Sequence, residues 1–575
     1  MLTTRRPFLA DEELGKKDDD HRPQKPSHFW RSSKRWKLPR LRRIILGVAA
    51  LYMLYLFFGN MPTDLSPAPE RFNPAFAESR QRAGMPWSPP APSPAIPQRD
   101  PPPRDDYAPE GSFYYEGSVH FHSLGKTLYR FRKSPGAHGL PASRAVVFAG
   151  ANLKSISDLL PLACKMANQR ANEVHLVLMG RDNVSIEGIQ HVNGIDDSDC
   201  PIYWHDGRVD YAQWSTDARM ERAAASGLAY VQAYLSPQAV ITQGESSEEV
   251  FFLQGIERKA RELGTAHIVL PTATRDIMWI SSLDSHSLQA WNDMRIEILI
   301  QAPTQSSGSF IRLIRSLKDA DYLGSAPGLT IELPHDVDPQ LLQFLKTMKW
   351  PSDASNKVTL RRRVRHGVLD AAEASLRTAE AFYPQDPNMT HVLMLSPQTE
   401  LSAYFYHYLK HTVLKYKYST NAGQMASDLL GISLELSSSL PASDESVNFP
   451  TLDTNRFPGL DEREPMPVSL GQVPNSNAAL YFGDKWVEFQ SFLSERLAKE
   501  VASSHEKVIS ERYPAVMEYL LEFMRAKDYY LLYPAARGTQ TLATVHSDLF
   551  QAPEEYSDES WAKSTKPDNV EDQSN

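Results

Sequence analysis

Two aspartates stand two positions apart directly after an apolar run of the chain. Asp336 and Asp338 follow residues 329–333, whose sequence Leu-Thr-Ile-Glu-Leu favours a buried strand. Because Mg²⁺ and Mn²⁺ prefer carboxylate oxygens, such a pair could hold a metal ion, or it could contact a bound ligand directly. The alternative is a solvated turn in which an aspartate caps a helix or forms an Asx-turn. The residue types leave these interpretations open.

Three consecutive arginines form the next candidate group, at Arg361, Arg362 and Arg363. Their guanidinium groups could offset the negative charge of a diphosphate. A solvated helix face explains the same run equally well.

Single carboxylates complete the set of candidates. Glu400 follows the apolar run at 391–395, and Asp484 and Glu488 lie further downstream. A reaction at a hydroxyl group needs a base to take its proton, and Asp484 or Glu488 could serve as that base. Helix capping and a helix-surface position are the alternatives for both residues.

The elements that must position these residues can be predicted from apolar runs. Strands are expected at 296–300, 329–333 and 391–395, with a serine-capped helix at 309–317 and a helical stretch at 360–382. Ligands bind beyond the carboxyl ends of strands in open α/β sheets. Asp336, Asp338 and the residues after Leu395 are therefore expected to share one edge.

An earlier region shows the same alternation of short apolar runs and helical patterns. The runs lie at 145–150, 174–179, 239–242 and 267–270. Such alternation predicts a parallel sheet with helices on both faces, in a Rossmann-like arrangement. No P-loop, G-x-G-x-x-G or G-x-S-x-G pattern occurs in the sequence.

The N-terminal part predicts a membrane anchor. Residues 44–59 are uncharged and mostly apolar, a basic cluster precedes them, and 14 of the 42 prolines lie within 62–109. A buried core helix is the alternative, but no domain-like sequence surrounds the run. The flanking charges predict one spanning helix, with the N-terminus in the cytosol and the rest of the chain lumenal.

Composition limits the partners. The net charge is −9 although residues 1–43 carry 13 basic and six acidic residues, so the remaining chain is acidic and unlike a nucleic-acid binder. Two cysteines, Cys164 and Cys200, allow one disulfide bond in an oxidising compartment. The predicted divisions are a basic tail at 1–43, the anchor at 44–61, a proline-rich stem at 62–110, a Rossmann-like region at 111–290, a second α/β domain at 291–551 and a disordered acidic tail at 552–575.

Several stretches between 295 and 418 carry a family resemblance: Ile298-Leu-Ile-Gln-Ala-Pro-Thr304 with residues 310–317, then 330–336, 357–367 and 391–408. They resemble the nucleotide-sugar-dependent glycosyltransferase domain of the GT-A type, family two, and most of all a fungal group of type II Golgi membrane proteins. Likeness is weaker at 481–486 and 529–534. The resemblance implies a GT-A fold for 291–551, a nucleotide-diphosphate sugar as donor and Mn²⁺ or Mg²⁺ as cofactor. It implies that Asp336, with Asp338 beside it, contacts the nucleotide, and that the three arginines lie near the diphosphate.

One position departs from the family pattern. The strand at 391–395 should be followed by a metal-binding D-x-D, but Ser396, Pro397 and Gln398 stand there, and Glu400 is the nearest acid. Either the metal is held in another way, with Glu400 as the remaining ligand, or basic residues replace it as the counter-charge, or the site does not catalyse.

The sequence thus predicts a Golgi glycosyltransferase. It would move a sugar from a nucleotide-diphosphate donor to a glycan, glycoprotein or wall-polysaccharide acceptor in the lumen. The alternative is a non-catalytic descendant of the same fold that binds glycans or scaffolds transferase complexes. A lumenal hydrolase with paired carboxylates is a third hypothesis, although no spacing singles out an acid pair.

Overall fold

The computed structural model describes part of the chain. The described residues are 52, 100–104, 111–131, 143–195, 199–271, 274–350, 358–364, 370–435, 468–499, 509, 513–534 and 541–551. The chain divides into two compact units, Met1–Ser93 and Pro94–Asn575, and every element below belongs to the second. The predicted basic tail, anchor and acidic C-terminal tail lie outside the described residues, apart from Tyr52. Among the helices that are described, none combines the length and apolarity needed to cross a bilayer.

The N-terminal α/β region is built on a five-stranded sheet. All its strands run parallel, in the order β3-β2-β1-β4-β5. The strands are β1 (Ala145–Gly150), β2 (Glu173–Leu178), β3 (Tyr203–Asp206), β4 (Ala239–Gln243) and β5 (Ala266–Leu270). Because both faces are covered, β1 and β4 are buried along their whole length, which explains their continuous apolar runs. The predicted α/β class with a parallel sheet is confirmed.

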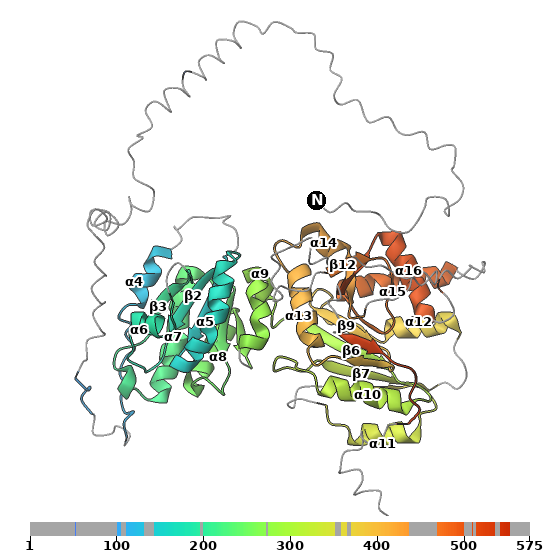
Figure 1. Cartoon of the computed structure of the whole chain (residues 1–575), viewed down its shortest axis with the longest axis horizontal. Helices are drawn as coiled ribbons and strands as arrows, with labels where there is room; N and C mark the ends of the chain where they lie inside the picture. The colour runs from blue at the N-terminus through green and yellow to red at the C-terminus, as the bar shows by residue number, and fades with distance from the viewer. Residues whose placement is uncertain are drawn as a thin grey trace, which may run out of the picture. The chain divides into compact units, whose positions relative to one another are not determined.

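Helices on the two faces of this sheet divide its core in two (Figure 1). Val146 and Phe148 pack with α5 (Leu153–Asn168) on one face, whereas Val147 packs with α7 (Asp217–Leu235) on the other. Successive strand residues point to opposite faces, so one strand supplies both clusters. The other helices are α4 (Leu124–Leu128), η1 (Tyr129–Phe131), α6 (Ile186–Val192), η2 (Ala212–Trp214), α8 (Val250–Leu263), η3 (Thr274–Ser282) and α9 (Ser285–Gln289).

A disulfide bond joins Cys164, on α5, to Cys200, just before β3. Their Cα atoms are 4.7 Å apart and the two residues are 36 positions apart in the sequence. The bond covalently links α5 to the segment that precedes β3, the edge strand of the sheet. The sequence alone left this pairing open.

The C-terminal α/β region contains an eight-stranded sheet of order β12-β14-β11-β13-β9-β6-β7-β8. Strands β8, β7, β6 and β9 are mutually parallel, and β13 runs antiparallel to both β9 and β11. Its strands are β6 (Arg295–Gln301), β7 (Gly328–Leu333), β8 (Val358–Arg362), β9 (Thr390–Leu395), β11 (Leu429–Ser433), β12 (Val468–Gly471), β13 (Ala478–Tyr481) and β14 (Tyr530–Pro534). A separate antiparallel pair joins β10 (Thr399–Leu401) to β15 (Ala543–Val545).

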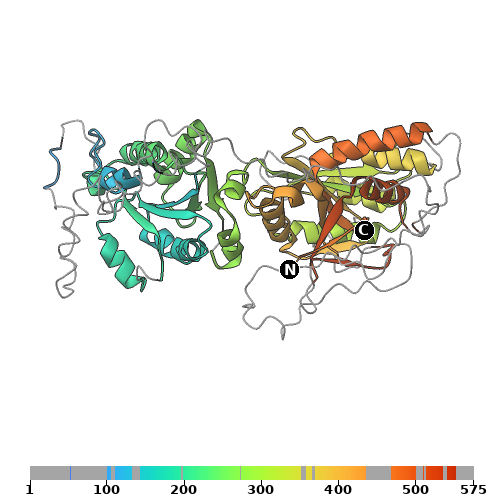
Figure 2. The same cartoon turned by 90° about the horizontal axis from the view of Figure 1, so that it is seen from above.

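Seven helices are described in this region. Figure 2 shows the same fold from above. Phe310, on α10, belongs to the cluster on one face of the sheet, and Phe489, on α15, to the cluster on the other. The helices are α10 (Ser307–Lys318), α11 (Pro339–Thr347), α12 (Ala371–Glu380), α13 (Phe405–Tyr416), α14 (Gly423–Asp428), α15 (Gly483–Lys499) and α16 (Ala515–Lys527).

Two local predictions in this region are wrong. The stretch at 360–382 is not one helix, because residues 358–362 form the edge strand β8, paired in register with β7, and α12 begins only at Ala371. Charged, exposed side chains are common on edge strands. The predicted serine cap of the helix at 309–317 also differs: Ser306 precedes α10 with a φ of 71° and its side chain makes no capping bond.

Candidate functional site

The order of strands in the larger sheet reverses between β6 and β9. The chain passes from β6 to β7 and β8 on one side, and then returns to β9 on the other side of β6. In open α/β sheets ligands bind outside the carboxyl ends of strands at such a switch point. We call the ends of β6, β7, β8 and β9, with the residues that directly follow them, the β6/β9 edge.

The structure places Asp336 and Asp338 at this edge, after β7, but in different roles. The Asp336 side chain is 88% exposed, and its Oδ1 lies 3.8 Å from His335 Nε2. Asp338 is the N-cap of α11, where its Oδ1 accepts a hydrogen bond from Gln340 N at 3.0 Å. For Asp338 the structure therefore shows the capping alternative. Contact with a nucleotide stays a prediction for both residues.

The three arginines end and follow β8 at the same edge. Arg361 donates to Ala381 O at 2.7 Å, and Arg362 donates to His335 O at 2.9 Å. The backbone N–H of Arg363 donates to Leu333 O. Arg362 thus holds the loop that carries Asp336, while contact of the arginines with a diphosphate stays a prediction.

Glu332 is a buried acid at this edge that the sequence analysis missed. Its side chain is 8% exposed and lies 3.0 Å from Arg377 Nε and 3.5 Å from Arg361 Nη1. A carboxylate in the otherwise apolar run at 329–333 was the available signal. A buried carboxylate of this kind indicates that a cation lies nearby, but the sequence does not show which one. The partners, Arg361 and Arg377, come from β8 and α12.

Glu400 lies on β10, shortly after β9. Its Oε2 is 2.8 Å from His546 Nε2, and Gln398 Nε2 donates to Asp548 Oδ1 at 2.9 Å. Residues near the C-terminal end of the described chain therefore contact the position where the family pattern has its D-x-D. His546 and Asp548 had no signal in the sequence, because they are brought here only by the pairing of β10 with β15.

Asp484 and Glu488 lie at the opposite edge of the sheet. They are on α15, which follows β13, and β13 runs antiparallel to β9, so α15 starts near the amino end of β9. Asp484 pairs with Lys417 at 2.7 Å, and Glu488 accepts from Tyr529 at 2.7 Å. The structure does not bring these two carboxylates together with Asp336 and Glu400. Their role as a base stays a prediction.

The smaller sheet has its own switch point, between β1 and β4. There the carboxylate of Glu248 lies over the start of α5, where both its oxygens are 3.1 Å from Ala151 N and it also accepts from the Ser155 hydroxyl. Burial raises the pKa of Glu248 to about 8. Backbone N–H groups at a helix start favour an anion. In this protein the chain's own carboxyl group takes that position.

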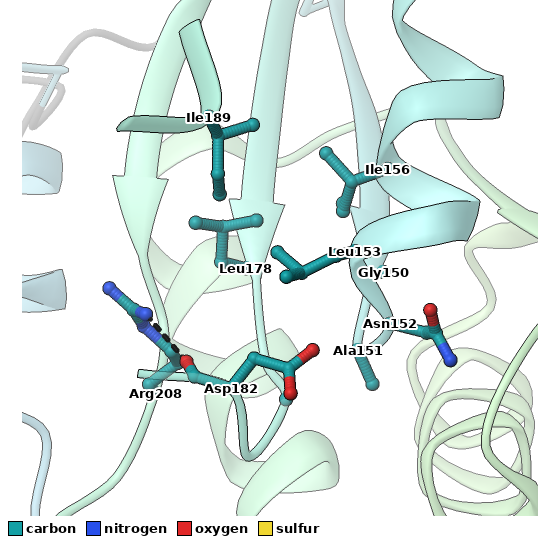
Figure 3. A pocket seen from close by; sticks show the side chains of 10 residues that line it. Gly150, Ala151, Asn152, Leu153, Ile156, Leu178, Asp182, Ile189 and Arg208 are labelled. Carbon is teal, nitrogen blue, oxygen red and sulfur yellow. Dashed lines mark hydrogen bonds between the residues drawn. The ribbon is translucent and has the colours of Figure 1, made fainter. Parts of the chain in front are cut away.

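A small pocket opens beside this point, between the ends of β1 and β2 (Figure 3). Its floor is apolar, and its only cation is Arg208, which is bound to Asp206 Oδ2 at 2.7 Å and to Asp182 O at 2.7 Å. Gly180 is required in the wall, because an added Cβ would lie 1.7 Å from Ala151 O. The lining residues are Gly150, Ala151, Asn152, Leu153, Ile156, Leu178, Gly180, Asp182, Ile189 and Arg208.

Glu248→Gln is expected to change the pH dependence of stability. The pKa of the Glu248 carboxyl is about 8 in the folded protein, whereas its ordinary value is 4.5. Because the unfolded chain loses this proton at lower pH than the folded protein does, the free energy of unfolding falls as the pH rises from 4.5 to 8. Glutamine does not titrate. The stability of the variant relative to the parent should therefore rise by about 2 kcal/mol between pH 6 and pH 8, measured by urea unfolding.

Glu187, exposed on α6 and away from Glu248, provides the control for this prediction. Glu187→Gln should keep a constant difference from the parent over the same pH range. A constant difference for Glu248→Gln as well would contradict the buried, neutral carboxyl.

In the described part of the chain, no group of three or more His, Cys, Asp or Glu side chains is placed to hold an ion. The predicted Mn²⁺ or Mg²⁺ stays a prediction.

Two family models match the chain. Residues 127–291 match the SPBC1E8.03c N-terminal domain, and residues 308–502 match the SPBC1E8.03c C-terminal domain. The two matches correspond to the two α/β regions. No curated protein matches the chain.

Three solved structures are similar to parts of the chain at low identity. GalNAc-T7 with UDP, GalNAc and Mn²⁺ is 10% identical over 44% of this chain and 44% of its own, with a TM-score of 0.27. A putative UDP-N-acetylglucosamine 2-epimerase from Listeria monocytogenes is 11% identical over 39% and 70%, with a TM-score of 0.17. The mannosyltransferase PcManGT from Pyrobaculum calidifontis, in complex with GDP-Man and Mn²⁺, is 10% identical over 43% and 58%, with a TM-score of 0.24. This chain thus spans less than two thirds of either transferase, and likeness at this level says nothing about its ligands.

Proposed function

We propose that the C-terminal α/β region, residues 291–551, is a glycosyltransferase domain that binds a nucleotide-diphosphate sugar at the β6/β9 edge. The observation that carries this proposal is the switch point between β6 and β9, with the exposed carboxylate of Asp336 beside it. The resemblance of residues 295–418 to GT-A enzymes supports the same edge. The sugar would pass to a glycan, glycoprotein or wall-polysaccharide acceptor.

In this proposal Asp336 accepts hydrogen bonds from the nucleotide, and Arg361 and Arg362 offset the charge of the diphosphate. The acceptor oxygen bonds to the anomeric carbon, while the bond from that carbon to the diphosphate oxygen breaks. Asp484 and Glu488 lie at the other edge, so Glu400 is the carboxylate that can take the hydroxyl proton.

The side chains at the end of β9 do not fit a divalent cation. Ser396, Pro397 and Gln398 offer no carboxylate, so Glu400 is the one carboxylate in the segment directly after β9, and a single carboxylate is too few for such an ion. We therefore derive no step through Mn²⁺ or Mg²⁺. As to localisation, we propose that the apolar run at 44–61 anchors the chain in the Golgi membrane as a type II protein, with the α/β regions in the lumen.

Asp336→Asn tests the proposal. We expect the full chain to bind one of a panel of UDP- and GDP-sugars in calorimetry, and the variant to bind it at least about tenfold more weakly, because one charge-assisted hydrogen bond is worth about 1.5–3 kcal/mol. Each titration is run with Mn²⁺ and again with a chelator.

The matched control is Asp338→Asn, two residues away. In this proposal Asp338 caps α11 and does not contact the donor. Asparagine caps a helix as well as aspartate does, so α11 is preserved and donor affinity should be unchanged. Equal affinities of the parent and both variants would remove Asp336 from the site. Absence of binding to every donor would reject the transferase.

One observation favours a second candidate function, a non-catalytic protein that binds glycans or scaffolds transferase complexes. Gln398 and Glu400, at the position of the missing D-x-D, are bonded to Asp548 and His546 rather than left for a ligand. Binding of glycans by a protein that binds no nucleotide sugar would support it.

A further inference from the structure

A segment close to the C-terminal end of the described chain lies against the β6/β9 edge. We call residues 546–551, which follow β15, the C-terminal strap. At one end His546 N donates to Gln398 O at 3.0 Å, directly after β9. At the other end Leu549 N donates to Ser309 Oγ at 2.7 Å, on the first turn of α10, which follows β6. The strap therefore runs between the residues that follow the two strands of the switch point.

The strap uses the hydrogen-bond donors of that edge. Ser309 N donates to Leu549 O at 3.0 Å, and the Ser307 hydroxyl donates to Phe550 O at 3.1 Å. N–H groups in the first turn of a helix have no partner within the helix, and they commonly bind ligand oxygens such as those of phosphate. At α10 a carbonyl oxygen of the strap, Leu549 O, occupies the position in which a ligand oxygen would accept from Ser309 N.

Gly308 permits this close approach. A Cβ on Gly308 would lie 2.4 Å from Gln551 O and 2.5 Å from Gln551 C, and both atoms are backbone that no side-chain rotation can move aside. Gly308 lies in the first turn of α10 and its φ is not positive, so the helix backbone itself does not require glycine there. The close approach of the strap, rather than the helix, therefore accounts for glycine at this position.

The charge of the strap also opposes a diphosphate. Asp548, held by Gln398 Nε2 at 2.9 Å, places a carboxylate next to the end of β9. Two like charges in adjacent positions repel each other, and at an exposed site such as Asp548 the repulsion is modest and weakened by salt. A bound diphosphate and this carboxylate would therefore disfavour each other.

We propose that the C-terminal strap closes the donor site, and that a nucleotide diphosphate binds only when the strap leaves the first turn of α10. This inference rests on the proposed function, because it concerns the same edge. The apparent affinity of a ligand falls in proportion to the fraction of open molecules. Opening the strap should thus strengthen binding without any new contact to the ligand.

Gly308→Ala is the variant that opens the strap, since it introduces the clash with Gln551. We expect it to bind UDP or GDP about tenfold more tightly than the parent in calorimetry with the full chain, if the parent is open about one tenth of the time. The matched control is Gly125→Ala on α4, where an added Cβ meets no atom within 4 Å. This control should bind like the parent.

A second variant closes the strap. Ser309→Cys with Leu549→Cys places a cysteine pair across the contact, and both native cysteines are already bridged to each other. The oxidised protein should not bind UDP or GDP and should recover binding on reduction, whereas the parent treated with the same reductant should be unchanged. The cross-link is scored by mass spectrometry without any ligand.

The outcomes separate the two proposals. Failure of the cysteine pair to cross-link would overturn the placement of the strap, and nucleotide binding by the cross-linked protein would overturn its closing role. Equal affinity of Gly308→Ala and the parent would also overturn that role. If the cross-link forms but no variant binds any nucleotide, the proposed function fails, and the closing role fails with it.

Discussion

Acidification from pH 7 to pH 5 is expected to lower the free energy of unfolding by several kcal/mol, a large fraction of the stability of a typical domain. The cause is a set of buried histidines whose pKa values are lowered by burial. The pKa falls to about 3 or 4 for each of them: His175, His205, His267, His391 and His411.

The hydrogen bonds of these rings explain why they stay neutral. Gly483 N donates to His391 Nδ1 at 3.1 Å, so that nitrogen cannot also carry a proton. His175 Nδ1 and His205 Nε2 are 3.0 Å apart and share one bridging proton. A further proton on either ring would place two N–H groups or two charges against each other in a fully buried site.

The sign follows from proton binding by the unfolded chain. Unfolded histidines take up protons near pH 6.5, whereas the folded rings do so only near pH 3–4, so their stability contribution is full above about pH 6.5 and is lost below it. At pH 5 each ring lowers the free energy of unfolding by about 2 kcal/mol. Glu248, whose pKa is raised, acts in the opposite direction and returns about 2 kcal/mol.

Urea unfolding followed by circular dichroism at pH 7, 6 and 5 measures this loss. His175→Phe should reduce the loss by about 2 kcal/mol, because the phenyl ring does not titrate. His191→Asn is the control, since His191 is exposed and should leave the pH profile unchanged. Stability that does not change down to pH 5 would contradict the neutral, buried rings.

Arg219→Met is expected to lower the free energy of unfolding by about 3–5 kcal/mol. The Arg219 side chain, on α7, is fully buried, and its Nη2 lies 2.6 Å from Asp210 Oδ1. It also donates to Gly117 O at 2.9 Å and Ser118 O at 2.6 Å. These bonds hold the segment before α4 against α7. Methionine fills most of the volume but removes the guanidinium group that faces the buried carboxylate of Asp210.

Arg222→Met, one turn along the same helix, is the matched control. Arg222 pairs with Glu116, but the two side chains are 55% and 47% exposed, so the loss should be at most about 1 kcal/mol. Adding Asp210→Asn to Arg219→Met should restore part of the stability, because it removes the buried negative charge that Arg219 no longer offsets. Equal urea midpoints for the two arginine variants would contradict the buried pair.

The sequence predicted the strands that are buried on both faces most accurately. The predicted runs at 145–150, 239–242, 329–333 and 391–395 correspond to β1, β4, β7 and β9 within about one residue. Such strands carry a continuous apolar signal, because both sides of the strand face the core. The edge strand β8 has no such signal: its arginines are exposed, and they were wrongly assigned to a helix.

The candidate site was predictable only in part. Asp336 and Asp338 were placed correctly after a strand, because the apolar run and the carboxylates are adjacent in the sequence. The sequence did not reveal that Asp484 lies at the other edge. That placement depends on the direction of β13, which is set by backbone pairing with β9, about 90 residues earlier.

The sequence by itself determined the α/β class, the buried parallel strands and the position of Asp336, because these follow from burial patterns within a few residues. Only the tertiary structure decided which strand ends meet, that Glu248 lies over the start of α5, and that Leu549 contacts Ser309 from 240 positions away. Contacts of this kind depend on strand order and chain direction, and no local pattern of side chains encodes either.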